Sequence, residues 1–343
     1  MARERIVSGE QQGPEDESFS WSLRPKSIAE YIGQLDLIEK IGISISAARM
    51  RDEPLEHVLL HGPPGLGKTT LAHIIANEMG SELRVTSGPT LERAGDLLGI
   101  LTNLERGDVL FIDEIHRLGK TVEEYLYPAL EDFKVDFVID KGTFAKTICV
   151  PLKGFTLIGA TTRAGMLSEP LRNRFGITHH IDFYPAEDLT QIIRRAAGLL
   201  HTPISEEAAI EIARRSRGTP RVANGLFRRV RDYADVRGDG RITPELADKA
   251  LKMWGVDALG LDDLDRRYLR VVIDIYEGGP VGIEAIAATI GEESDTLMDM
   301  VEPFLLKIGF LARTRSGRKV TQAAWQHLGI DPPRGSNQNL LFR

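Results

Sequence analysis

The sequence predicts an α/β fold in its first half, built on a parallel sheet, followed by two smaller domains that are mainly helical. Three observations lead to this prediction. A glycine-rich loop at 62–70 joins a short apolar run to a helical pattern, as in parallel sheets that bind phosphates. A second strand pattern, at 108–114, is apolar over 109–112 and ends in Asp113 and Glu114. From 185 onward, helical patterns follow one another and end in a short basic hairpin.

The loop at 62–70 matches the phosphate-binding pattern G-x-x-x-x-G-K-[ST]. Its glycines let the backbone turn with N–H groups pointing inward, where a side chain would block a polyphosphate. Lys68 brings a cation to the outer phosphates, and the hydroxyl of Thr69 is placed to coordinate Mg²⁺. The flanking pattern is a buried strand at 58–60 and a helix at 69–79 whose N-terminus faces the anion. The predicted polyphosphate site comprises Gly65, Leu66, Gly67, Lys68, Thr69 and Thr70.

The composition is typical of a soluble globular protein. The 343 residues suggest two or three domains, and 42% are hydrophobic and 27% charged. No apolar run is long enough to span a bilayer, and the polar start at 1–17 does not resemble a secretory signal, so we expect a cytoplasmic protein. Cys149 is the only cysteine, which excludes internal disulfides and cysteine-based zinc sites. The eight histidines suggest no metal site, because neighbouring histidines within a strand point to opposite faces.

The formal net charge of −7 argues against a protein that coats nucleic acid along its whole surface. However, 304–330 contains Lys and Arg but no Asp or Glu, whereas acids dominate the charged residues of 257–302, with only Arg266, Arg267 and Arg270 against them. A basic segment on an acidic molecule indicates a specific surface, with an ordinary solvated face as the alternative.

The first half continues with elements that suit a nucleotide-binding sheet. The aromatic-rich segment at 19–32 either folds over a nucleotide base or caps the domain, and 35–49 has helical spacing. A strand at 83–86 and a helix at 91–103 precede the strand that ends in Asp113 and Glu114. A buried strand of this kind delivers its carboxylates to the ligand edge of the sheet. We therefore expect Asp113 to hold Mg²⁺ and Glu114 to polarise the attacking water.

Two further patterns follow in this half. The end of a helix at 125–132 leads into a hairpin at 134–150, which is either a partner surface or a hairpin packed on its own domain. A buried strand at 155–160 then ends near Thr162, where a polar side chain touches the γ-phosphate and the lytic water. Arg172 and Arg174 precede a strand at 177–183. Either arginine reaches a phosphate, in its own chain or in a neighbour, or forms an ion pair with surface acids.

The second half is helical and rich in arginine. Helical spacing covers 186–200, 205–216, 220–235 and 243–254. Arg221 follows Pro220 in the first turn of its helix, an unfavourable place for a cation unless an anion is near.

After a linker at 255–260, helices at 262–276, 283–290 and 294–308 precede a hairpin with a basic tip. This plan is that of a winged helix, which binds DNA in many proteins and protein partners in others. Arg313, Arg315 and Arg318 would contact phosphates, which positions DNA without reading its sequence.

The order of these motifs resembles that of the AAA+ ATPases. The resemblance rests on the phosphate loop and on the runs at 113–118, 156–165, 171–176 and 218–221, and it extends from about 19 to about 329. Together with Leu23-Arg24-Pro25 and the winged helix, the set is similar to the branch-migration motors of that superfamily, which act on Holliday junctions.

The resemblance implies roles for several residues. ATP would be the nucleotide, with Leu23, Arg24, Tyr31 and Ile32 lining its adenine pocket and Tyr184 lying nearby. Thr162 aligns with sensor 1, Arg221 with sensor 2, and Arg174 with the arginine finger that reaches the ATP of a neighbouring subunit. The hairpin at 134–150 aligns with the one that contacts the junction-binding partner protein. The family works as a hexameric ring around duplex DNA, together with a junction-resolving nuclease.

The motifs and the composition together predict how the chain divides, and some points stay open. We expect a flexible arm at 1–18, an ATPase domain at 19–184, a helical lid at 185–255, a winged helix at 256–330 and a disordered tail at 331–343. The wing departs from the family's pattern, because its inner arginine, Arg315, is moved by one position.

Two other functions remain as alternatives to a branch-migration motor, namely a clamp-loader-like switch and a protein unfoldase. No convincing aromatic pore loop supports the unfoldase.

Overall fold

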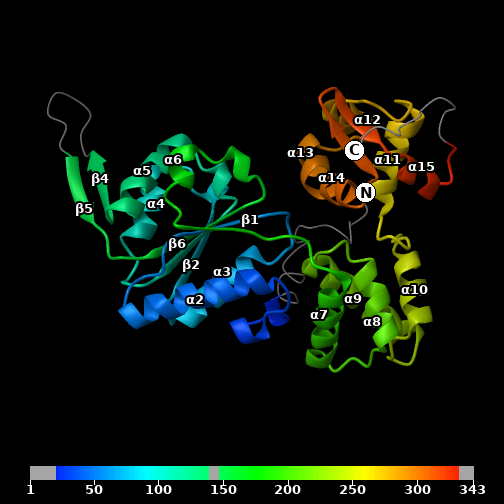
Figure 1. The fold of residues 1–343 in the computed structure, drawn as a ribbon, viewed down its shortest axis with the longest axis horizontal. Helices are drawn as coiled ribbons and strands as arrows, with labels where there is room; N and C mark the ends of the chain where they lie inside the picture. The colour runs from blue at the N-terminus through cyan, green and yellow to red at the C-terminus, as the bar shows by residue number, and fades with distance from the viewer. Residues whose placement is uncertain (1–20, 139–146, 332–343) are drawn as a thin grey trace. The chain divides into compact units, whose positions relative to one another are not determined.

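The structure is a computed structural model and describes residues 21–138 and 147–331 (Figure 1). The predicted N-terminal arm, the tip of the predicted hairpin and all but the first residue of the predicted tail lie outside these residues. The described chain divides into one compact unit that ends at Tyr184 and another that begins at Pro185.

The first unit contains a five-stranded sheet with the order β2-β3-β6-β1-β7, and every neighbouring pair of strands is parallel. The predicted parallel α/β sheet is thus confirmed. Because the strands are parallel, their carboxyl ends meet at one edge, where ligands bind in open sheets of this class. The strands are β1 (Val58–His61), β2 (Leu83–Ser87), β3 (Val109–Asp113), β6 (Thr156–Thr161) and β7 (Ile177–His180).

Helices cover both faces of this sheet, with α2 and α3 on one face and α4, α5 and α6 on the other (Figure 1). They are α2 (Leu35–Arg51), α3 (Lys68–Met79), α4 (Ala94–Leu101), α5 (Lys120–Glu131) and α6 (Glu169–Arg172). Short 3-10 turns are η1 (Ile28–Glu30), η2 (Gly88–Thr90), η3 (Ile115–Arg117) and η4 (Ala164–Met166). The helix predicted at 91–103 is shorter than expected, because Arg93 has an extended backbone and α4 begins only after it.

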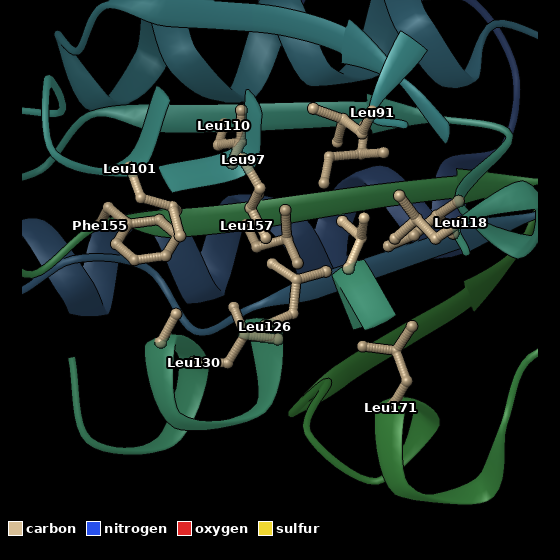
Figure 2. Packing of buried hydrophobic residues seen from close by; sticks show 14 of the residues in the cluster. Leu91, Leu97, Leu101, Leu110, Leu118, Leu126, Leu130, Phe155, Leu157 and Leu171 are labelled. Carbon is tan, nitrogen blue, oxygen red and sulfur yellow. The ribbon is translucent and has the colours of Figure 1, made fainter. Parts of the chain in front are cut away.

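Leucines from the sheet and from helices α4 and α5 form the core shown in Figure 2. Leu110 and Leu157 come from β3 and β6, Leu97 from α4, and Leu126 and Leu130 from α5. Each fully buried leucine contributes about 1.5–3 kcal/mol of transfer free energy. This packing holds β3 and β6 in place. It therefore also fixes the positions of the polar side chains at the carboxyl ends of these strands.

The predicted hairpin consists of β4 (Lys134–Val138) and β5 (Thr147–Pro151), which pair antiparallel with Lys134 opposite Pro151. Val135 at its base is buried in the core of the same unit, whereas Ile148 is exposed. The base of the hairpin therefore packs on its own domain, while Ile148 leaves an apolar side chain exposed.

The second unit begins with four helices that correspond to the predicted lid: α7 (Ala186–Leu199), α8 (Glu206–Arg214), α9 (Pro220–Arg237) and α10 (Pro244–Met253). The hydroxyls of Ser205 and Thr243 cap α8 and α10 by accepting a backbone N–H from the first turn. Pro220 and Pro244 occupy first turns, where the missing N–H has no helical partner to lose.

A winged helix follows in the same unit, as predicted. Its elements are α11 (Asp263–Asp274), α12 (Ile283–Ile290), α13 (Ser294–Thr296), the π-helical turn η5 (Leu297–Val301), α14 (Glu302–Lys307), β8 (Leu311–Thr314), β9 (Gly317–Val320) and α15 (Gln322–His327). The π turn interrupts the helix predicted at 294–308. Pro303 explains it, since a wider turn avoids the clash between a proline ring and the carbonyl four residues earlier.

The wing also differs in detail from the prediction. Arg313 pairs with Arg318 and Thr314 with Gly317, so the turn consists of Arg315 and Ser316 alone. Arg318 therefore lies in strand β9 rather than at the tip. Helix α15 was not predicted from the sequence, and its Trp325 closes the domain core. In the part of the chain that the structure describes, no helix has the length and apolar character needed to cross a membrane.

Candidate nucleotide site and wing surface

The phosphate loop connects β1 to α3 and adopts backbone angles that require glycine. Gly62, Gly65 and Gly67 have φ values of +146°, +79° and +99°. A Cβ atom on Gly62 would lie 2.2 Å from the carbonyl oxygen of Ile181. The loop therefore owes its shape to its glycines, as the motif predicts.

Lys68 begins α3 and is only 7% exposed. Its Nζ donates hydrogen bonds to the carbonyl oxygens of Gly62 and Pro63, both at 2.9 Å. The ammonium group is thus held inside the loop by weak neutral acceptors, and a phosphate would be the stronger partner. Thr69 and Thr70 follow Lys68 in the first turn of α3.

Two tyrosines predicted near the nucleotide lie against the loop. The hydroxyls of Tyr31 and Tyr184 are 2.7 Å apart, and the Tyr184 hydroxyl donates to the carbonyl of Leu66 at 3.4 Å. A Cβ atom on Gly67 would be 3.3 Å from the Tyr31 hydroxyl. Burial raises the pKa of Tyr31, and its hydrogen bond to Tyr184 opposes that shift. Tyr31 therefore stays neutral, and both tyrosines support the loop through these contacts.

The other residues of the predicted adenine pocket lie in the same unit. Leu23 is buried and Ile32 is partly buried. The guanidinium of Arg24 lies 4.6 Å from the ring centroid of Trp21, which in turn meets the ring of His73 edge-on at 4.5 Å. The segment before α2 is thus fastened to α3, the helix that begins with Lys68.

The predicted catalytic carboxylates stand at the ligand edge of the sheet. Asp113 ends β3, and Glu114 follows with a left-handed φ of +46°, which turns its side chain away from the strand direction. One carboxylate oxygen of Glu114 lies 3.3 Å from the Thr162 hydroxyl and 3.1 Å from His116 Nδ1. Thr162 directly follows β6, the neighbour of β3 in the sheet. The structure thus brings together Glu114 and Thr162, which are 48 residues apart.

Electrostatics keep Glu114 ionised. Burial tends to raise the pKa of Glu114, but the hydrogen bond and charge of His116, the charge of Lys68 and the Thr162 N–H together hold it below its ordinary value. His116 was not assigned a role from the sequence, although it stands two residues after Glu114 in the same motif. Its Nδ1 also lies 2.9 Å from the hydroxyl of Thr161.

Arg174 lies close to helix α5 of its own chain. Its Nη1 donates to the carbonyl of Pro170 at 2.7 Å, and its Nη2 donates to Glu131 at 3.0 Å. The guanidinium stacks over the ring of Tyr127, with its carbon 4.5 Å from the ring centroid. Sequence reasoning missed Tyr127, because the contact depends on how α5 packs beside α6. Arg221 occupies the second position of α9, in the second unit.

Two of the three arginines predicted to bind DNA share a buried carboxylate. Glu302 is fully buried and accepts hydrogen bonds from the Tyr268 hydroxyl at 2.8 Å, Arg313 Nε at 2.8 Å and Arg318 Nε at 2.9 Å. Arg315, in the turn, is exposed. Contact of the three arginines with DNA phosphates stays a prediction. Arg313 and Arg318 also have a structural role, because they supply hydrogen bonds to buried Glu302.

Several histidines have hydrogen-bonding partners within the fold. His57 is buried, with Nε2 3.1 Å from the carbonyl of Leu130 and Nδ1 accepting the N–H of Leu157 at 2.9 Å. His61 and His180 are opposite each other on β1 and β7, with their Nδ1 atoms 3.2 Å apart. No group of three or more His, Cys, Asp or Glu side chains among the described residues is arranged to hold a metal ion. Mg²⁺ at a phosphate site needs only one or two protein ligands, so Thr69 and Asp113 suffice as a donor set.

Family comparisons cover nearly all of the chain. Residues 23–181 match the Holliday junction DNA helicase RuvB P-loop domain, 184–257 match the RuvB AAA lid domain, and 258–329 match the RuvB C-terminal winged helix domain.

Solved structures of a bacterial protein agree with these matches. Thermotoga maritima RuvB, described as a Holliday junction branch migration motor, is 53% identical, with 91% of this chain and all of that chain covered at a TM-score of 0.84. A single-substitution mutant of the same protein is 52% identical, with 90% of this chain and 100% of that chain covered at a TM-score of 0.85. The phosphate loop, the parallel sheet, the lid and the winged helix are the parts that these proteins share with the chain. The chain therefore belongs to the RuvB family of AAA+ ATPases.

Proposed function

We propose that this chain is an ATP-driven motor that moves the branch point of Holliday junctions by pulling duplex DNA, in recombination and DNA repair in the cytoplasm. The observation that carries the proposal is the placement of Glu114 and Thr162 at the sheet edge beside the phosphate loop, in a chain that also carries a winged helix. The family membership supports it, because the matching protein is a branch migration motor.

ATP is the proposed substrate, and the loop's backbone N–H groups with Lys68 hold its phosphates. Thr69 and Asp113 would hold Mg²⁺, which would offset charge on the phosphate oxygens. Glu114, kept ionised by His116 and Lys68, orients and polarises the attacking water. Thr162 donates a hydrogen bond to Glu114, and in the proposed role it also contacts the γ-phosphate. Leu23, Arg24, Tyr31, Ile32 and Tyr184 form the base-binding side, and Arg221 is the nucleotide-sensing arginine of the lid.

The active form is proposed to be a homohexameric ring in which Arg174 acts on the ATP of the neighbouring subunit. Arg174 would leave Glu131 and Tyr127 of its own chain for a triphosphate, which is the stronger partner for a guanidinium. The hairpin β4–β5 would contact RuvA, the junction-binding protein of the RuvAB complex, through its exposed apolar side. The wing, with Arg313, Arg315 and Arg318, would contact DNA phosphates. A junction-resolving nuclease is a further proposed partner.

A branch-migration assay on a synthetic four-way junction tests the proposal. With ATP, Mg²⁺ and RuvA, we expect branch migration to convert the four-way junction into separate duplex products. We expect no branch migration with ADP. A clamp-loader-like switch would bind DNA with ATP but move no strands continuously. Absence of movement under all these conditions, with ATP hydrolysis intact, would overturn the proposed motor activity.

A further inference from the structure

Side-chain contacts hold in place the segment that connects the lid to the winged helix. Arg266 of α11 donates to the carbonyl of Gly255 and to that of Leu261, both at 2.7 Å. His327 of α15 lies 2.8 Å from Asp257. A Cβ atom on Gly260 would lie 2.5 Å from the carbonyl oxygen of Arg215. The segment that the sequence suggests as a linker is therefore held to both domains.

Arg217 makes the deepest of these connections. Its backbone is left-handed, with a φ of +58°, and its side chain is 4% exposed. Its Nη2 donates to Asp265 of α11 at 2.9 Å, and the Asp265 side chain is fully buried. Its guanidinium also stacks over Phe304 of α14, with its carbon 4.5 Å from the ring centroid. One lid side chain thus contacts two helices of the winged helix.

The position of Arg217 in the chain links it to α9. Arg217 stands in the turn that leads from α8 to α9, and the Thr219 N–H closes that turn on the carbonyl of Ser216 at 3.0 Å. Arg221 follows in the first turn of α9. A movement of the start of α9 therefore acts directly on the Arg217 backbone. Removing one member of a buried ion pair leaves the other charge buried without compensation, which is strongly unfavourable.

We propose that Arg217 couples α9 to the winged helix, so that the lid and the winged helix move as one lever when nucleotide is turned over. Arg217 is in this view a positioning residue that acts through Asp265 and Phe304. The inference rests on the proposed function, because it requires that nucleotide turnover displace α9. Chains of packed side chains and ion pairs of this kind are a physical route for coupling between sites.

Spin-label distances across the joint test the lever directly. In a full-length Cys149→Ser background, labels at Val236→Cys of α9 and Glu292→Cys beside α12 occupy exposed positions on either side of the joint. We expect one narrow distance distribution with the same centre in ADP and in a slowly hydrolysed ATP analogue. A centre that shifts between the two nucleotides would overturn the lever, whatever the variants below show.

Arg217→Met provides the functional arm, with Arg194→Met as its control. Arg194 also pairs with a carboxylate, Glu206 at 3.1 Å, but this pair is exposed and lies within the lid. For Arg217→Met we expect a broadened distance distribution and a branch-migration rate lower by about tenfold, with duplex affinity changed by less than about twofold. Arg194→Met should match the parent protein. Branch migration at the parent rate in a folded Arg217→Met variant would overturn the coupling role.

The two proposals fail in different ways. If the parent protein shows the same spin-label distance in both nucleotides but does not move DNA junctions, the proposed motor activity is wrong. The proposed rigid connection between the lid and the winged helix would still hold. A parent protein that moves junctions while its distance changes with nucleotide would refute the lever alone. If Arg217→Met does not fold, the distances in the parent protein decide the question without it.

Discussion

At the scale of single residues, the site is organised by polar side chains whose partners lie far along the chain. Arg174 is the clearest case, because it contacts Glu131 and Tyr127 within its own chain and is proposed to act on a neighbour's ATP. Its partners hold the guanidinium in a fixed place without burying it completely, since 26% of the side chain is exposed.

Arg174→Ala should therefore spare ATP binding and lower turnover by about three orders of magnitude, the size typical of arginine fingers in other NTPases. Equilibrium binding of a fluorescent ATP analogue and steady-state phosphate release measure the two effects. The unfolding temperature should change little, because the pair with Glu131 is partly solvated. Turnover at the parent rate would show that Arg174 takes no part in hydrolysis.

Glu114→Gln should bind ATP normally and hydrolyse it about 10²–10⁴-fold more slowly, because the amide cannot take a proton from water. Glu82→Gln is a matched control, since Glu82 is an exposed acid of the same unit that pairs only with Arg84 among the contacts found. Retention of bound ATP over time, followed by rapid filtration, measures the trapped state. Hydrolysis by Glu114→Gln at the control's rate would remove Glu114 from the mechanism.

His57 gives a prediction about pH and stability. Burial lowers the pKa of His57 from its ordinary value of 6.5, and its Nδ1 accepts a backbone N–H, so protonation would break that bond. The neutral ring therefore stabilises the fold above pH 6.5, and this contribution is lost as the pH falls toward the lowered pKa. We expect the thermal midpoint to drop between about pH 7 and about pH 5, and to drop less steeply in His57→Gln. Equal slopes for the two proteins would contradict this role.

At the scale of elements, the wing shows that one strand pair serves both structure and binding. Arg313 and Arg318 face each other on β8 and β9 and both bond to Glu302 at the start of α14. Their charges are thus held in place by a buried acid, while their outer N–H groups are the ones proposed to meet phosphate. Arg315, in the turn, has no such structural task among the contacts that the structure describes.

The two kinds of arginine should therefore respond differently to removal. Arg315→Ala should weaken duplex binding and lower the salt slope by about 1 without changing stability. Arg318→Ala should do the same and also lower the free energy of unfolding by about 1–3 kcal/mol, because Glu302 loses a buried partner. Salt-dependent DNA titrations and urea unfolding separate the two effects. An unchanged salt slope in both variants would argue against a wing that faces DNA.

At the scale of the whole molecule, the proposed catalytic site is complete only when Glu114 and Arg174 come from adjoining subunits. Glu114→Gln and Arg174→Ala should each be inactive alone, but mixed rings contain interfaces with both native residues. With random mixing of equal amounts in a closed ring, about a quarter of the interfaces have both native residues, and ATPase activity should rise accordingly. Measuring ATPase activity against mixing ratio tests this prediction. A mixture as inactive as its components would indicate that the site is not shared.

The sequence predicted the order of strands and helices in the nucleotide-binding unit well, because that information is local. The glycines of 62–70, the apolar runs before His61 and Asp113, and helical spacing each act over a few residues. Prediction was poorer where a local pattern met a distant constraint. Pro303 widens one turn of its helix, and α15 exists because Trp325 has a core to enter.

By itself, the sequence determined the family, the parallel-sheet ATPase fold and the residue types of the phosphate loop, since these depend on spacing along the chain. Only the tertiary structure decided which partners the charged groups take. Arg217 with Asp265, Glu302 with Arg313 and Arg318, and Arg174 with Glu131 are such partners. The physical reason is that burial and hydrogen bonding choose among many available carboxylates, and both depend on how helices and strands distant in sequence pack together.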